Sequence, residues 1–248
     1  MAGRLAINGG MPAFGLPTDY PRVRRVNSFR ELASTPLTHG VNALCWPRTL
    51  PGDYPEVLRL LTIPAGEAIT VLDEARLQSL PVSAAGRVAV DQLLADQRQL
   101  RDLGLDPALN CISGYPRDEQ PGPVATDVFS FHADSAEIEA DTWLCTYCGP
   151  ASEGLRNEEA QRHVDIPATR AALLRHYGGP DDEDFLGYLR EHCYDLHYAP
   201  APAARLFPFG QGNLWRIALD YPGNPVPPCI HRAPATFPGQ PPRLLLIS

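Results

Sequence analysis

Residues 131–134 read Phe-His-Ala-Asp and close a run from Val124 to Phe131 whose alternation is typical of a half-buried strand. In a strand, side chains two residues apart lie on one face, so His132 and Asp134 would lie side by side, with α-carbons about 6.6 to 7 Å apart. An imidazole and a carboxylate at this spacing can bind one divalent metal ion. The His-x-Asp pair therefore predicts two ligands of a metal site.

The same pattern occurs a second time, as His163-Val-Asp165. Asp165 stands directly before Ile-Pro-Ala-Thr-Arg, and a carboxylate just before a helix with proline in its first turn is typical of an N-cap. We therefore predict that Asp165 caps a helix and that this second pair does not bind metal.

A third ligand has to come from far along the chain, and His231 in Pro-Cys-Ile-His-Arg-Ala-Pro lies on a short strand-like run. If it completes the site, His132 and His231 lie next to each other in space. Arg243 follows and opens the final run Arg-Leu-Leu-Leu-Ile, on one face with Leu245 and Ile247. A guanidinium on an otherwise apolar strand requires an anion, which is either a protein carboxylate or a bound ligand.

This ordered set resembles the iron and 2-oxoglutarate ligands of the Fe(II)/2-oxoglutarate-dependent dioxygenases, over about residues 123–248. The resemblance implies that His132, Asp134 and His231 hold Fe(II). It implies that Arg243 binds the distal carboxylate of 2-oxoglutarate, aided by a hydroxyl group such as that of Thr146 or Tyr147. The implied reaction is oxidative decarboxylation of 2-oxoglutarate to succinate and carbon dioxide, coupled to oxidation of an unidentified small-molecule or protein substrate.

Five segments also resemble the blocks of a bacterial family known as domain of unknown function 1826, from about residue 40 to 248. They read Asn42-Ala-Leu-Cys-Trp46-Pro-Arg48, Phe131-His-Ala-Asp134, Leu144-Cys-Thr-Tyr-Cys-Gly149-Pro150, His231-Arg-Ala-Pro234 and Arg243-Leu-Leu-Leu246. The chain departs from this family at Cys148, where a basic or polar residue is expected, and near Glu153, where a tryptophan is absent. The resemblance implies no established activity, and the departures concern the substrate side of the site.

Two other classes of function use the same residues differently. A metal-binding or small-molecule-binding β-barrel without oxygenase activity, for example in metal homeostasis, could hold zinc, because imidazole and carboxylate do not select iron by affinity. A structural interaction module would bury His132 and His231 as ordinary core residues. Cys145-x-x-Cys148 has zinc-knuckle spacing, but the chain has no second such pair, and on a strand the two thiols would face opposite sides.

Composition restricts the partners. The 248 residues include 21 basic and 29 acidic side chains, and the net charge of −8 disfavours a nucleic-acid backbone or an anionic membrane surface as partner. Every basic residue is arginine, which excludes Schiff-base chemistry on lysine and a Walker-type phosphate lysine. No run approaches the roughly 18 apolar residues of a membrane span, and the first residues lack a signal-peptide core. We therefore expect a cytoplasmic protein whose six cysteines are reduced thiols.

The elements that must position these residues differ between the two halves of the chain. In the first hundred residues, capping residues and a 3.6-residue period predict helices over 53–61, from 73 and over 86–103. The second half predicts short strands over 124–132, 142–147, 214–219, 229–232 and 243–247, with helices over 166–177 and 184–193 between them.

These elements predict a single domain, residues 1–248, that is mainly β with helical additions. Its core would be a double-stranded β-helix (jelly roll, cupin-like) over 111–248, with a helical insertion at about 165–195, buttressed by a helix-rich part over 1–110. An immunoglobulin-like sandwich is less favoured because the strands come late and at irregular intervals.

Overall fold

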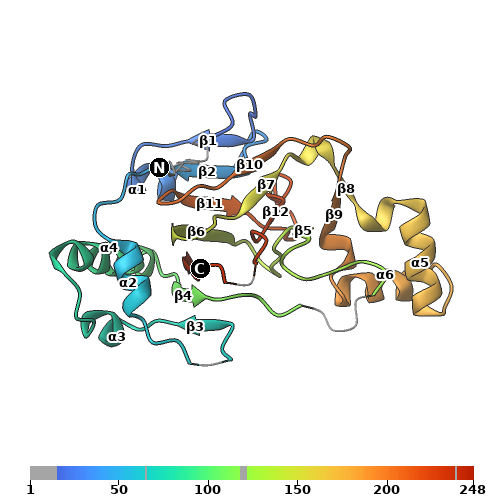
Figure 1. Ribbon diagram of the computed structural model, residues 1–248. Helices are drawn as coiled ribbons and strands as arrows, with labels where there is room; N and C mark the ends of the chain where they lie inside the picture. Colours follow the sequence, from blue (N-terminus) through green and yellow to red (C-terminus); the bar gives the residue numbers. More distant parts are fainter. Residues whose placement is uncertain (1–15, 65, 118–121, 238) are drawn as a thin grey trace, which may run out of the picture.

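The computed structural model of the chain describes residues 16–248 except 65, 118–121 and 238. It is a mixed α/β fold in which two curled β-sheets lie at the centre, with α2, α3 and α4 at one end and α5 and α6 at the other (Figure 1). The α-helices of the described residues are α1 (Phe29–Ser34), α2 (Tyr54–Leu60), α3 (Glu74–Gln78), α4 (Ala84–Arg101), α5 (Pro167–Tyr177) and α6 (Glu183–Glu191).

The larger sheet has seven strands, and only its edge pair β1–β2 is parallel. In spatial order its strands are β1 (Val23–Arg25), β2 (Ala43–Trp46), β11 (Leu214–Ala218), β6 (Asp141–Cys148), β13 (Arg243–Ile247), β4 (Ala108–Ile112) and β3 (Ile69–Val71). The smaller sheet is antiparallel and consists of β10 (Leu206–Pro208), β7 (Glu153–Leu155), β12 (His231–Arg232), β5 (Phe131–His132), β9 (His197–Pro200) and β8 (Ala160–Arg162).

The larger sheet is buried on both faces, because successive side chains of β6 pack alternately into two different hydrophobic cores. Trp143 and Cys145 pack into the hydrophobic core formed with the helices α2 and α4, whereas Leu144 packs into a second core between the two sheets. On the neighbouring strand β13, Leu244 faces the helices and Leu245 faces the smaller sheet. The space between the sheets is therefore where side chains of both can meet.

The helices at one end begin at the predicted capping residues. Asp53 caps α2 by accepting a hydrogen bond from the backbone N–H of Glu56, and Asp73 does the same for α3. The α4 helix buries the stripe that includes Val90, Leu93 and Leu100 against the larger sheet. These helices confirm the interpretation of the first hundred residues.

One expectation about strands was wrong. The run over 124–130 does not form a strand, because Asp127 folds back and accepts a hydrogen bond from the N–H of Phe129, so that the strand is confined to Phe131–His132. The first 110 residues also supply four strands of the larger sheet, β1 to β4, in addition to helices. The helical insertion predicted at about 165–195 is present as α5 and α6.

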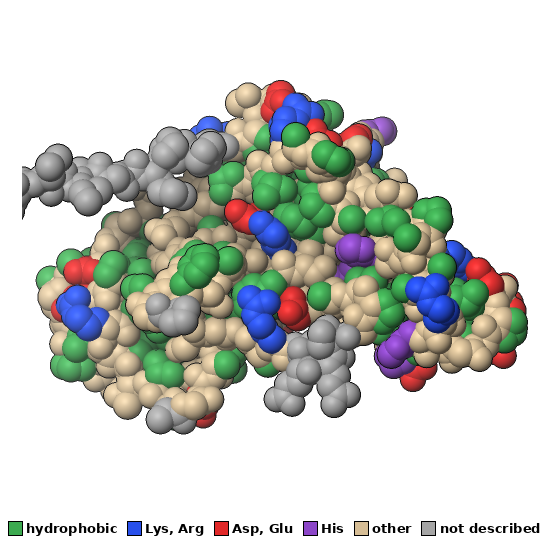
Figure 2. Space-filling model, turned by 45° about the vertical axis from the view of Figure 1, so that its right-hand side comes forward, with side chains coloured by type: hydrophobic (Ala, Val, Ile, Leu, Met, Phe, Trp, Pro, Cys, Tyr) green, Lys and Arg blue, Asp and Glu red, His purple; other side chains and the backbone are tan. Residues whose placement is uncertain are grey.

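Acidic and basic side chains lie next to each other at several places on the face shown in Figure 2. Ion pairs of the described residues include Arg22–Glu158 and Arg170–Asp181. All six cysteines are free thiols, as expected. Within the described part of the chain, no helix has the length and apolarity needed to cross a membrane.

Candidate metal centre

The two predicted histidine ligands lie directly opposite each other on neighbouring strands. His231 on β12 pairs in register with His132 on β5, and the centroids of their imidazole rings are 4.7 Å apart. Antiparallel pairing brings opposite side chains together on one face, so residues far apart in the sequence become neighbours. The expected adjacency of His132 and His231 is therefore confirmed.

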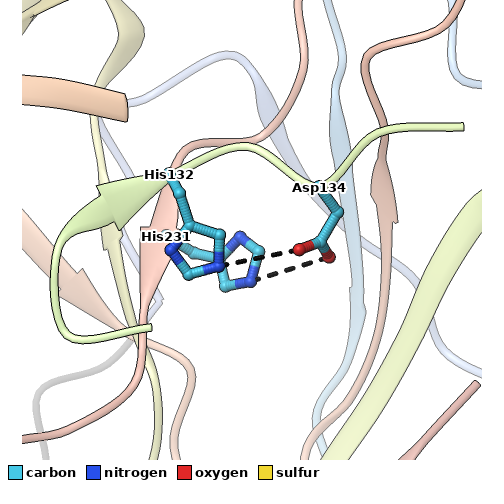
Figure 3. Close-up of side chains that lie close together, drawn as sticks. All are labelled: His132, Asp134 and His231. Atoms are coloured by element: carbon cyan, nitrogen blue, oxygen red, sulfur yellow. Dashed lines mark ion pairs between the residues drawn. The ribbon is translucent and has the colours of Figure 1, made fainter. Parts of the chain in front are cut away.

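Asp134 completes the group just after β5. Both imidazoles point toward its carboxylate (Figure 3), with 3.6 Å between His132 Nε2 and Asp134 Oδ1 and 3.8 Å between His231 Nε2 and Asp134 Oδ2. One ligand atom of each residue lies within 4.8 Å of those of the other two. Two ligand bonds of about 2.1 Å span at most about 4.2 Å, so small side-chain movements suffice to bring all three onto one ion.

Backbone carbonyl groups orient both imidazole rings. His132 Nδ1 lies 2.8 Å from the carbonyl oxygen of Ser130, and His231 Nδ1 lies 3.3 Å from that of Cys229. A carbonyl oxygen can only accept, so Nδ1 donates in both rings, and Nε2, which faces Asp134, is the nitrogen left to bind a metal. Burial, and secondarily the neighbouring His231, lower the pKa of His132, which favours the neutral form that binds metal.

The carboxylate of Asp134 is oriented by a hydrogen bond from a neighbouring strand. Thr142, on β6 of the larger sheet, donates a hydrogen bond of 2.7 Å to Asp134 Oδ2. Outer partners of this kind orient metal-ligating carboxylates. The group therefore has the donor set and the outer hydrogen bonds of a three-residue metal site with open positions, which suits a non-haem metal centre.

A cavity of about 270 Å³ lies between the sheets and connects this group to Arg243. Its walls include the three metal-site residues on one side and Arg243 on β13 on the other, with mainly apolar side chains between them. The apolar lining residues are Ile69, Ile112, Val128, Leu144, Ala233, Leu245 and Ile247. A mainly apolar cavity with a few convergent polar groups is typical of a small-molecule site.

Arg243 is the buried cation of this cavity, with 3% of its surface exposed. Its guanidinium donates to three hydroxyl groups, those of Thr146 at 2.9 Å, Ser152 at 3.2 Å and Tyr115 at 3.2 Å. Its Nε–H is buried without a partner, and the group forms no ion pair with a carboxylate of the described residues. Burial lowers the pKa of this guanidinium. Because no carboxylate of the described residues pairs with it, its positive charge is uncompensated.

Comparisons with protein-family models, with curated proteins and with solved structures give no match. The two family resemblances of the sequence therefore stay predictions.

The second His-x-Asp pair lies elsewhere and differs from our expectation in one respect. His163 and Asp165 form a 3-10 turn outside the group of His132, Asp134 and His231. Asp165 does not cap α5, so that prediction was wrong. The N-cap is Ile166, and both carboxylate oxygens of Asp165 bind Arg162 instead, at 2.8 and 3.1 Å.

Two hydroxyl groups were proposed to aid Arg243. The hydroxyl group of Thr146 binds Arg243, whereas that of Tyr147 lies on the other face of the sheet. Tyr147 lies on the helix-facing side of β6 and binds Asp96. Sequence reasoning missed Tyr115 and Ser152, which lie outside regular strands where no periodicity marks a facing side. It also missed Thr142, although the alternation Thr142, Leu144, Thr146 along β6 could have indicated it.

Proposed function

We propose that this protein is a non-haem Fe(II)/2-oxoglutarate-dependent oxygenase. The observation that carries the proposal is the uncompensated charge of Arg243 in the wall of the cavity that also contains the His132, Asp134 and His231 group. A metal-binding barrel without oxygenase activity has no use for a buried arginine that lacks an anion. A dicarboxylic acid that reaches from the metal to Arg243 would supply it.

The roles of the chain's residues follow from their positions. His132, Asp134 and His231 would hold Fe(II), and Arg243 with its three hydroxyl partners would bind the far carboxylate of 2-oxoglutarate. When bound, Fe(II) in such a facial triad supplies the activation of dioxygen. The apolar walls would keep water from the reacting groups and receive an uncharged part of the substrate.

The proposed reaction converts 2-oxoglutarate, dioxygen and a substrate R–H to succinate, carbon dioxide and R–OH. Dioxygen takes up four electrons, two from 2-oxoglutarate and two from the substrate, and one oxygen atom goes to each. We further propose that the two curled sheets, with the metal residues on one and Arg243 on the other, form the double-stranded β-helix core of such enzymes.

Arg243→Lys tests this proposal, because lysine keeps the charge but loses the planar fork of donors. Calorimetric titration of 2-oxoglutarate into the Fe(II)-loaded protein without oxygen should show binding weakened by about 1.5 to 3 kcal/mol, with iron affinity little changed. Arg216 on β11 is the matched control, because it is paired with Asp141 at 2.6 Å. Arg216→Lys should lower stability and leave 2-oxoglutarate binding unchanged. If the wild-type protein binds no 2-oxoglutarate, the oxygenase proposal is wrong.

A further inference from the structure

A buried polar cluster lies on the other face of the larger sheet, away from the cavity. Arg48 follows β2, Asp96 lies on α4 and Tyr147 lies on β6. Arg48 Nη1 binds Asp96 Oδ1 at 2.8 Å, and the Tyr147 hydroxyl donates to Asp96 Oδ2 at 2.6 Å. Asp96 is 1% exposed. We refer to these three side chains as the Arg48 network.

The network reaches three consecutive residues of β6. Arg48 Nη2 lies 3.4 Å from the sulfur of Cys145. Arg48 Nε donates to the carbonyl oxygen of Gly212, whose own N–H donates to the carbonyl oxygen of Thr146. Asp96 holds the hydroxyl group of Tyr147. Residues 145–147 are therefore held at three successive points, Cys145 and Tyr147 through their side chains and Thr146 through its carbonyl oxygen.

Residue 147 is also where the pairing of β6 with β13 shifts. Leu244 pairs with Cys148 but Leu245 pairs with Thr146, so Tyr147 is the extra residue of a β-bulge. A bulge changes the direction in which neighbouring side chains point. Tyr147 and Cys148 both pack on the helix-facing core, and Thr146 points the other way, where its hydroxyl group accepts a hydrogen bond from Arg243.

We propose that the Arg48 network positions the anion-binding group of the cavity: it fixes the bulge of β6 and thereby holds the Thr146 hydroxyl group on Arg243. The inference rests on the proposed role of Arg243 in binding a carboxylate. The network contains residues of two segments singled out in the sequence, 42–48 and 144–150. The proposed metal site does not explain these segments, and the network proposes a role for both. The network makes no hydrogen bond to Arg243 or to the His132, Asp134 and His231 group, so its members are positioning residues.

A double-mutant cycle tests this inference. Tyr147→Phe, Thr146→Val and the double variant are titrated anaerobically with 2-oxoglutarate in the Fe(II)-loaded protein. Thr146→Val should weaken 2-oxoglutarate binding about tenfold, and Tyr147→Phe about three- to tenfold. Because Tyr147 acts through Thr146, the double variant should bind no more weakly than Thr146→Val. Iron affinity should stay within about twofold of the wild type.

Tyr54→Phe is the matched control. The Tyr54 ring stacks on that of Tyr147 with centroids 5.5 Å apart, but its buried hydroxyl group has no hydrogen-bond partner. This variant removes a hydroxyl group from the same core without touching the network, and it should bind 2-oxoglutarate as the wild type does. A merely structural network predicts a different result: Tyr147→Phe would lower the melting temperature and leave the dissociation constant unchanged, which would overturn the inference.

Glutarate, which has both carboxylates but no keto group, separates this inference from the proposed function. Titrated into the metal-free protein, it should show the same order of affinities across the variants. That pattern would support the network even if the iron-loaded protein failed to turn over 2-oxoglutarate. Independent, additive effects of Tyr147→Phe and Thr146→Val would contradict the network while leaving the oxygenase proposal intact. A wild-type protein that binds neither acid would overturn both.

Discussion

The chain contains the same three-residue pattern twice, and the two copies have become different structures. His132 lies on β5 opposite His231, with Asp134 beside both imidazoles. The second pair, His163 and Asp165, lies on a 3-10 turn, and its carboxylate binds an arginine whose side chain is 48% exposed. The short pattern is thus compatible with a metal ligand pair and with a surface ion pair.

Local geometry explains the difference. Side chains two residues apart share a face only in an extended strand. In a 3-10 helix, with three residues per turn, side chains two residues apart point about 120° apart around the axis and so lie on different faces. What makes the first copy a site is therefore the strand and the partner that pairs with it. The comparison teaches that a ligand motif has to be judged together with the element that carries it.

The largest expected difference between the copies is in metal binding. Asp134→Ala removes one of three ligands and should weaken metal affinity at least about a hundredfold, more than the loss of an outer partner does. Asp165→Ala should leave the affinity unchanged. Titration with Fe(II) under anaerobic conditions, followed by elemental analysis of the desalted protein, measures both. Loss of metal in Asp165→Ala with the fold intact would show that the second copy is the site.

Removing the hydrogen-bond partner of Asp134 should weaken metal binding, whereas removing the partner of Asp165 should not. Thr142→Val removes the hydrogen bond to Asp134 while keeping the shape of the side chain, and metal affinity should fall about 10- to 100-fold. Arg162→Gln removes the corresponding partner of Asp165 and should not change it. Competition with a chromophoric chelator measures both constants. Equal affinities in Thr142→Val and the wild type would mean that this hydrogen bond does not orient the ligand.

The smallest effect concerns stability. Because Asp165 pairs with Arg162 at the surface and does not cap α5, Asp165→Ala should lower the free energy of unfolding by only about 0.2 to 1 kcal/mol. Chemical denaturation of the metal-free protein checks this value. A loss near 2 kcal/mol, the upper range for an N-cap, would instead favour the capping role that we first inferred from the sequence.

Sequence reasoning brought His132, Asp134 and His231 together as one group because their order along the chain is more specific than any one of them. It found α2 from its capping residues and α4 from its 3.6-residue apolar period. It missed β2 and β4, whose short runs Ala-Leu-Cys-Trp and Ala-Leu-Asn-Cys-Ile are buried on both faces of the sheet and show no alternation.

The partners of Arg243 could be predicted only in part. Thr146 lies on a strand near the final one in space, and its hydroxyl group was proposed as one of two. Its alternative, Tyr147, lies one residue further along the same strand and therefore on the opposite face, with Trp143 and Cys145 toward the helices. Tyr115 and Ser152 come from segments without regular structure, whose positions depend on tertiary packing.

The most direct test of the central claim is the visible absorption spectrum of the Fe(II)-loaded protein during an anaerobic titration with 2-oxoglutarate. Chelation of Fe(II) by the keto acid gives a weak charge-transfer band, so the band requires the metal and the co-substrate in one cavity. We expect it to saturate at one 2-oxoglutarate per chain, to be absent in Asp134→Ala and to need higher 2-oxoglutarate concentrations in Arg243→Lys. An iron-loaded wild-type protein that develops no band at any 2-oxoglutarate concentration would contradict the account.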